Sequence, residues 1–433
     1  MEEVQAISKE LIKPSSPTPH HLRHYKLSFL DQISVPIFMP LVLFYPREIN
    51  TNNKERCDLI KKSLSEALTH FYPLAGRVID NMYIDCNDEG AHFVEACAKC
   101  TLSDILQNPN PSDLNKLLPY ELDHVNDLAA VFQVTFFECG GMAIGFGMSH
   151  KVGDALSFFM FLNSWAAIAR GDNSVSVPCF NSALLFPPKN ISGFQPRTGI
   201  MKDNIVTKRF VFVASTIAAL RAKYSDDSSS KSPRRPTRVE ALSAFIWSRF
   251  MATTKPEAHS SDKIYTVLHA VNLRPRMNPP LQELYFGNIS RIAVAVANME
   301  AKENKSYGIV SQMRDAIRNV NLDYVMKLQE RDGHLNFMKY RAEKVMKGEV
   351  VSFSFTSLCR FPIYEADFGW GKPVWVSSAS LTFKNLVVFL DTKEEDGIEA
   401  WINLKQEDMA KFEADKELLA HVSPNPNMKI SSF

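Results

Sequence analysis

One strand–loop–helix stretch, residues 142–169, constrains the fold of this chain more than any other. Over residues 142–148, large apolar side chains alternate with alanine and glycine, and this period of two predicts a β-strand. One face of that strand is bulky and the other nearly bare, so another backbone or a ligand can approach closely. Residues 155–169 are almost continuously apolar and precede Gly171, which predicts a buried helix with a glycine stop.

The loop between these two elements carries His150 and Asp154 in a His-x-x-x-Asp motif. Histidine is the commonest general base, because its ordinary pKa lies near neutrality. Loops held by rigid elements often carry catalytic residues. The alternative is a hydrogen-bonded core histidine, with Asp154 as a helix cap. Because the chain has 11 histidines, the motif can also arise by chance, so the motif alone does not decide between the two.

Composition excludes several classes of function. A length of 433 residues predicts two domains, and 45% hydrophobic with 22% charged residues is typical of a soluble globular protein. The net charge is +1 without a long basic run, which argues against nucleic acid or a membrane surface as partner. The longest apolar run, Val35 to Tyr45, is too short to span a bilayer.

The N-terminus has no apolar signal core, and the seven cysteines are scattered. Both features predict a cytoplasmic protein with reduced thiols. The Cys97-x-x-Cys100 pair has no second pair at zinc spacing, so no metal site is expected. Neither a Gly-x-Gly-x-x-Gly sequence nor a Gly-Lys-Ser/Thr loop is present, so hydride transfer and nucleotide hydrolysis lack their signatures.

The predicted elements divide the chain into two halves. Residues 1–171 form an N-terminal domain that includes a strand-like segment at 25–31 and carries the His-x-x-x-Asp motif. Residues 172–207 contain four prolines with little periodicity and predict a crossover linker. Residues 208–433 form a C-terminal domain with a hairpin at 381–390 and 398–404. Hairpins mixed with helices predict two α/β domains with mixed sheets.

A second motif, Asp367-Phe-Gly-Trp-Gly371, lies far from His150 in the sequence. Together the two motifs resemble the plant BAHD acyltransferases, coenzyme-A-dependent enzymes that acylate alcohols and amines. Further similar segments span nearly the whole chain: 69–77, 86–88, 137–141, 272–274 and 287–288. Details at 14–19, 30–32 and 277–280 are most similar to the vinorine synthase group, which acetylates alkaloids. Capsaicin-forming and acylsugar-forming members are similar at some of the same places.

The resemblance implies a fold and a reaction. The fold would be α/β, with two chloramphenicol-acetyltransferase-like domains and a channel between them. Acyl-coenzyme A, in the first place acetyl-coenzyme A, would be a co-substrate, with no bound cofactor and no metal. The acceptor would be a hydroxyl of a plant specialised metabolite, in the first place an alkaloid. The alternatives are a terpenoid, phenolic or sugar ester acceptor, or a catalytically quiet member that binds a ligand. Both halves lie in one chain, so a monomer is expected.

The resemblance also implies roles for individual residues. His150 would be the general base. Asp154 would either orient the histidine or, as in the family, pair with an arginine, here Arg274, to hold the loop in shape. In the second motif, Asp367, Gly369, Trp370 and Gly371 would be architectural, because the glycines permit a tight bend that the tryptophan anchors.

The residues that contact the substrates are less sharply defined. Thr356 and Asn288 are candidates for the substrate and oxyanion region. Some family members carry Thr-Ser-Trp where this chain has Thr356-Ser-Leu358, so an indole donor is missing here. For coenzyme A, the candidates lie in one basic segment, which is otherwise a solvated loop: Arg234, Arg235, Thr237 and Arg238.

Overall fold

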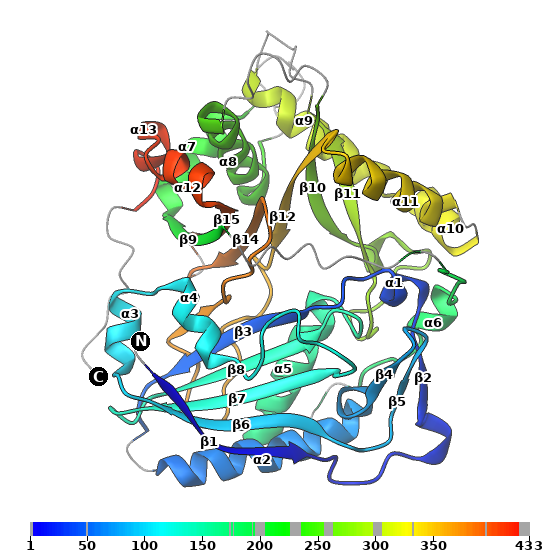
Figure 1. The fold of residues 1–433 in the computed structure, drawn as a ribbon, viewed down its shortest axis with the longest axis vertical. Helices are drawn as coiled ribbons and strands as arrows, with labels where there is room; N and C mark the ends of the chain where they lie inside the picture. The colour runs from blue at the N-terminus through cyan, green and yellow to red at the C-terminus, as the bar shows by residue number, and fades with distance from the viewer. Residues whose placement is uncertain are drawn as a thin grey trace.

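The computed structural model describes residues 3–48, 51–172, 175, 177–192, 194, 204–225, 235–254, 263–297, 305–330, 333–394 and 396–423. Two six-stranded mixed sheets form the centres of the two halves, and a small three-stranded sheet flanks the first (Figure 1). The small sheet has the order β2-β5-β4, with bounds His24–Lys26, Tyr83–Asp85 and Arg77–Ile79. This arrangement confirms the α/β class with mixed sheets.

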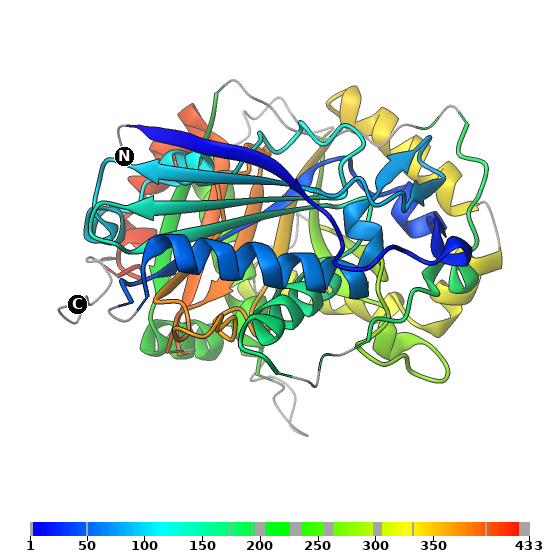
Figure 2. The same ribbon diagram turned by 90° about the horizontal axis from the view of Figure 1, so that it is seen from below.

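The first sheet has the order β1-β6-β7-β8-β3-β13. Its strands are β1 (Val4–Ile12), β3 (Phe38–Tyr45), β6 (Ala91–Ala98), β7 (Ala130–Phe137), β8 (Met142–Ser149) and β13 (Trp375–Ser377). Figure 2 shows the two long helices of this half, α2 (Asn53–His70) and α5 (Ala155–Ala169), against one face of the sheet. Every residue of β7 and β8 is buried, because covered strands in the middle of a sheet have no solvent face.

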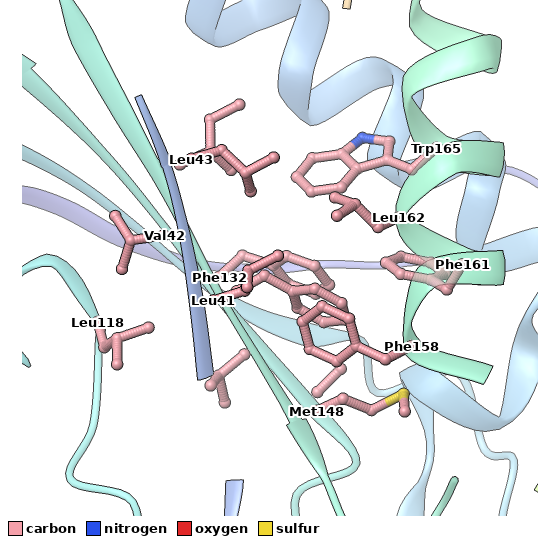
Figure 3. Packing of buried hydrophobic residues seen from close by; sticks show 14 of the residues in the cluster. Leu41, Val42, Leu43, Leu118, Phe132, Met148, Phe158, Phe161, Leu162 and Trp165 are labelled. Carbon is pink, nitrogen blue, oxygen red and sulfur yellow. The ribbon is translucent and has the colours of Figure 1, made fainter. Parts of the chain in front are cut away.

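Aromatic packing fixes α5 on the sheet (Figure 3). Phe146 of β8 stacks on Phe158 of α5 with ring centroids 4.2 Å apart, and on Phe132 of β7 at 4.9 Å. Trp165 meets Phe132 edge-on at 5.2 Å. Truncating one such buried ring typically costs about 3–5 kcal/mol. The loop between β8 and α5 is therefore held at both ends by rigid elements.

The second sheet has the order β11-β10-β12-β14-β15-β9. Its strands are β9 (Ile205–Phe212), β10 (Ile264–Asn272), β11 (Ser290–Val296), β12 (Val350–Ser357), β14 (Leu386–Asp391) and β15 (Ile398–Lys405). Helices pack around it: α7 (Ala214–Lys223), α8 (Arg238–Thr254), α9 (Lys305–Asn319), α10 (Leu322–Glu330), α11 (Gly333–Met346), α12 (Gln406–Glu413) and α13 (Lys416–Leu419). β12 pairs in parallel with both neighbours, and the other pairs are antiparallel.

Short elements connect these layers. They are α1 (Phe29–Gln32), α3 (Leu102–Gln107), α4 (Pro111–Leu114), α6 (Ser182–Leu185) and the 3-10 turns His20–Leu22, Tyr72–Ala75, Asn115–Leu117 and Arg274–Arg276. Figure 1 shows α1 at the border between the two large sheets. Among the described residues, no helix is both long and apolar enough to cross a membrane.

The predicted strand–loop–helix stretch is confirmed. The helix spans Ala155–Ala169, and Gly171 follows it with φ +80°. The bare face of β8 meets another backbone, because a Cβ on Gly145 would lie 1.9 Å from the Leu117 carbonyl oxygen. The C-terminal hairpin is confirmed as the antiparallel pair β14 and β15.

Two expectations differ from the structure. Residues 25–31 are not one strand, because Ser28 caps α1 through a capping box with Asp31. Within the predicted C-terminal domain 208–433, β13 pairs with β3 of the first sheet, and Trp375 stacks on Phe44 at 5.0 Å. A short apolar segment has no local feature that indicates which of two sheets it joins.

Candidate active site

The backbone of His150 is fixed directly after β8. Its N–H donates to the Ile37 carbonyl at 2.8 Å, and the preceding Ser149 N–H donates to the Ala129 carbonyl at 2.8 Å. Both partners lie just outside strands that flank β8 in the first sheet. The half-buried imidazole therefore extends from a loop whose start is fixed by the sheet.

One nitrogen of the imidazole forms a hydrogen bond within the loop. Nδ1 of His150 lies 3.2 Å from the Gly153 carbonyl, which can only accept, so Nδ1 carries the hydrogen and Nε2 has a free lone pair. Burial lowers the pKa of His150 below its ordinary value, although the Asp154 carboxylate and the Gly153 carbonyl oppose this shift. The side chain is therefore a neutral base at neutral pH.

Asp154 is directed to the second half of the molecule. Its carboxylate lies 2.8 Å from the Arg274 guanidinium, and both side chains are almost fully buried. It also accepts the N–H of Ser157, which caps α5, and the N–H of Ile289 at 3.0 Å. Burial opposes ionisation, but Arg274 and these N–H groups hold the pKa of Asp154 below its ordinary value. The implied ion pair with Arg274 is present, and no hydrogen bond joins Asp154 to the imidazole in the described part of the chain.

Asn288 joins the loop of His150, residues 150–154, to α1. Its Nδ2 donates to the His150 carbonyl at 2.8 Å and to Asp31 Oδ1 at 2.8 Å, and its backbone N–H donates to the same Asp31 oxygen. Both hydrogens of the Asn288 amide are thus engaged in holding the loop. Asp31 in turn accepts from the hydroxyl and the N–H of Ser28. Burial raises the pKa of Asp31 to about 6, although these hydrogen bonds oppose the rise.

The segment around Gly287 completes this contact between the halves. Gly287 has φ +122°, and its N–H donates to the Ser157 hydroxyl at 3.0 Å. A Cβ there would lie 2.7 Å from the Ser182 hydroxyl oxygen, so only glycine fits. Arg274 also donates to the Tyr285 carbonyl at 2.7 Å. Three segments, 28–31, 150–157 and 285–289, therefore form one buried polar network.

The second motif lies apart from this network. Asp367 Oδ1 accepts the N–H groups of Gly369 and Gly371, which have φ +108° and +95°. Trp370 lies under the Arg56 guanidinium at 5.0 Å and meets Tyr45 edge-on. These contacts form a closed turn against β3 and α2, and no contact within the described residues joins it to His150.

Thr356 lies on the open face of the second sheet. Phe353 and Phe355 of β12 are buried against the helices, so the alternate residue Thr356 faces the other way and is half-buried. No side-chain hydrogen bond of Thr356 occurs within the described ranges. Leu358, two residues on, packs against the first core.

The basic segment before α8 is partly engaged in structure. The Thr237 hydroxyl accepts the Glu240 N–H at 3.2 Å and so caps α8. Arg238 is paired with Asp391 at 2.8 Å. Arg235 is exposed, and Arg234 lies outside the described residues.

Sequence reasoning did not select Asp31, Ser157 or Gly287 as site residues. The Ser28-x-x-Asp31 spacing is a capping-box signal that could have placed a helix start, and with it a buried carboxylate, at this point. Nothing in the local sequence indicates that Ser157 and Gly287 meet, because they are 130 residues apart.

Comparisons with known proteins identify the family. A family model described as "Transferase family" matches residues 2–419. The chain belongs to this family, the BAHD acyltransferases. It is 38% identical to a limonoid 1-O-acetyltransferase of Citrus sinensis, covering 97% of this chain and 98% of that protein. It is also 38% identical to stemmadenine O-acetyltransferase of Catharanthus roseus, covering 95% and 97%.

A solved structure shows the same architecture. The crystal structure of vinorine synthase matches this BAHD acyltransferase with a TM-score of 0.85 at 35% identity, covering 98% of this chain and 100% of that chain. The enzyme class and the two-domain mixed α/β fold inferred from the sequence are thereby confirmed.

Proposed function

We propose that this acyltransferase moves an acetyl group from acetyl-coenzyme A to a hydroxyl group of a plant specialised metabolite. The observation that carries the proposal is the imidazole of His150. Its Nδ1 binds the Gly153 carbonyl, so Nε2 is left as a neutral base on a half-buried side chain. The names of the similar relatives, which are acetyltransferases of hydroxylated plant compounds, support the donor and the reaction.

The reaction follows from that base. Nε2 of His150 removes the proton of the acceptor hydroxyl as the oxygen attacks the thioester carbonyl carbon. The tetrahedral oxyanion collapses, the carbon–sulfur bond breaks, and coenzyme A leaves as the thiolate. The imidazolium then returns the proton to sulfur, so an ester and free coenzyme A are formed. A thioester is already activated, so the step requires no covalent acyl-enzyme. Holding both substrates together supplies much of the acceleration.

The other site residues position the base. The Asp154–Arg274 pair, Asn288 and Asp31 contact the loop and not the free nitrogen of His150. Asp367, Gly369, Trp370 and Gly371 shape a distant turn. Thr356, on the open face of the sheet, remains the candidate for the reacting centre, and exposed Arg235 remains the candidate for a coenzyme A phosphate. Because one chain carries both halves of the network, we expect a monomer, which light scattering can test.

Two acceptor classes compete. The sequence resemblance favoured an alkaloid, but the limonoid and the stemmadenine acetyltransferase are equally similar to this chain. Identity therefore does not separate a terpenoid from an alkaloid acceptor. A catalytically quiet ligand-binding protein is the alternative function, and the ordered base of His150 disfavours it.

The test is thiol release from acetyl-coenzyme A in the presence of hydroxylated terpenoids, alkaloids, phenolics and sugars. Wild type is expected to release thiol with one acceptor class, and His150→Ala should lower the rate about 10²–10⁴-fold, as expected for loss of a general base. His70→Ala, at an exposed position at the end of α2, is the matched control and should retain full activity. Full activity of His150→Ala would refute the assignment, and no release with any acceptor would support the quiet alternative.

A further inference from the structure

A large cavity lies along α11, between that helix and the second sheet. Its volume is about 2040 Å³, and residues of β10, β11, β12 and α9–α11 line it together with Val35. Figure 1 shows α10 and α11 running beside β10 and β11. Pockets for small molecules usually measure about 300–1,000 Å³, so a polycyclic ligand would fit with room to spare.

Two residues of the α11 cavity wall are close in sequence to residues that hold the loop of His150. Val35 in its wall is two residues before Ile37, whose carbonyl accepts the His150 N–H. Arg291 in its wall is three residues after Asn288, which binds the His150 carbonyl. A strand advances roughly 3.3 Å per residue, so Arg291 lies on the order of 10 Å along the chain from Asn288.

The charge of the lining is one-sided. Among the described residues, the lining holds no aspartate or glutamate and five lysines and arginines: Lys263, Arg291, Lys339, Arg341 and Lys384. None of the five forms an ion pair with a carboxylate of the described residues, although ion pairs are frequent elsewhere in the molecule. A cavity with only positive charges favours an anionic ligand.

Arg291 is the clearest member of this set. Its Nη2 lies 2.6 Å from His334 Nε2 and 3.6 Å from the Met338 sulfur. Its Nε is buried and has no hydrogen-bond partner among the described residues. Burial, together with Arg291 and Lys189, lowers the pKa of His334 to about 3, so this histidine is a neutral acceptor. The guanidinium is thus partly buried without a counter-charge from the described part of the chain, and such burial is costly unless a ligand supplies one.

Arg341 repeats the pattern on α11. Its Nη2 donates to the hydroxyls of Thr266 and Ser352, each at 3.1 Å. Hydroxyls are neutral, so they do not balance the charge. Burial lowers the pKa of Arg341, in keeping with a guanidinium that has lost part of its hydration.

Much of the remaining wall is apolar, and part of it is exposed. Ile292 is 44% exposed, Phe337 51% and Val345 44%, and all three line the cavity. Large apolar side chains at such exposure, gathered in one concave surface, are typical of a ligand site. The cavity therefore offers apolar surface together with cationic side chains.

We propose that the α11 cavity receives the acceptor, and that it selects an apolar polycyclic compound bearing a carboxylate over one bearing a protonated amine. A carboxylate forms paired, charge-assisted hydrogen bonds with a guanidinium. A protonated alkaloid would place a further cation among the basic residues of the lining. The inference rests on the proposed acetyl transfer, and it replaces the alkaloid acceptor suggested by resemblance with a hydroxylated terpenoid-like acid.

The test uses three probes with one skeleton: lithocholate, its methyl ester and its 24-amine, each with a hydroxyl at the far end. Dissociation constants are measured calorimetrically, and thiol release from acetyl-coenzyme A is followed with each probe. Wild type should bind the acid about tenfold or more tightly than the ester or the amine, and high salt should reduce this preference.

Arg291→Met should weaken binding of the acid about tenfold and leave the ester nearly unchanged. Arg318→Met is the matched control, because Arg318 is an exposed arginine of α9 outside the cavity lining. Arg291→Lys keeps the cation and should retain part of the preference, which provides a second variant if the methionine form does not fold.

The outcomes separate the two proposals. Equal or tighter binding of the amine, or an unchanged preference in Arg291→Met, would overturn the selection by charge even if acetyl transfer proceeds. Preferential binding of the acid, with no thiol release from acetyl-coenzyme A in the presence of these probes or of the wider panel, would support the anion-selective cavity and refute the acetyl transfer.

Discussion

Buried charges are paired in the polar network around His150, whereas Arg291 in the α11 cavity has no carboxylate partner among the described residues. Asp154 and Arg274 lie 2.8 Å apart, and every oxygen of that carboxylate also accepts a backbone N–H. Arg291, by contrast, meets only a neutral histidine and a thioether, and one of its nitrogens has no partner in the described part of the chain. Both arginines come from the same half of the chain, and they differ in what surrounds them.

The difference indicates two uses of a buried cation. A fully paired cation holds two segments in one geometry, and removing its partner leaves an uncompensated charge. An unpaired cation at a cavity stabilises nothing in the empty protein and becomes favourable only when an anion enters. We therefore expect the free energy of unfolding to depend strongly on Arg274 and weakly on Arg291.

The largest effect is expected from Arg274→Met. This change leaves Asp154 buried without its counter-charge, so the free energy of unfolding should fall by about 3–5 kcal/mol, measured by urea denaturation. Activity should fall as well, because the loop of His150 loses its tie to the second half. Arg318→Met removes only an exposed pair with Asp315 and should change stability by less than about 1 kcal/mol. In Asp154→Ala, lost activity with unchanged unfolding would instead favour a direct orienting role of Asp154.

Asp31→Asn should have a smaller effect that depends on pH. In the variant, an amide NH₂ replaces the Asp31 oxygen that accepts the N–H of Ser28. Two donors then face each other, which should lower the free energy of unfolding by about 1–3 kcal/mol. The pKa of Asp31 is raised to about 6, so its proton binds more tightly in the folded state, and this stabilisation is lost as pH rises through 6.

The difference in free energy of unfolding between wild type and Asp31→Asn should therefore be larger at pH 5 than at pH 7.5. It should grow by about 1 kcal/mol for each pH unit below the folded-state pKa of Asp31. Lys151, whose pKa is lowered by burial and raised by the Asp31 carboxylate, remains in both proteins. Asp58→Asn, at an exposed position on α2, is the control and should show no such trend. If the difference in free energy of unfolding between wild type and Asp31→Asn did not change with pH, Asp31 would be ionised throughout this range.

The two regions also differ in how far the sequence predicts them. The strand, loop and helix around His150 follow from local periodicity, since both elements are long and apolar. The Asp154–Arg274 pair spans 120 residues and was expected only through the family resemblance. Asp31 was assigned to a strand-like segment, although its spacing from Ser28 carried a capping signal.

The cavity has no local signal at all. Its wall takes residues from Val35 to Asn385, and what makes Arg291 unusual is the absence of a carboxylate among its neighbours in the described structure. A sequence shows which residues are charged but not which of them are paired. The same limit explains why β13, which lies within the predicted C-terminal domain 208–433, pairs with the first sheet without any local signal of it.

The smallest effect on stability is expected from Arg291→Met. This variant tests directly whether Arg291, unlike Arg274, is unnecessary for the stability of the fold. The change removes a cation that has no counter-charge among the described residues, and this gain offsets the loss of one hydrogen bond to His334. The free energy of unfolding should therefore change by less than about 1 kcal/mol without ligand, against about 3–5 kcal/mol for Arg274→Met. With saturating lithocholate, wild type should gain more stability than the variant, because only wild type binds the acid tightly. A loss of stability as large as that of Arg274→Met would show that Arg291 holds the fold and that its missing counter-charge marks no ligand site.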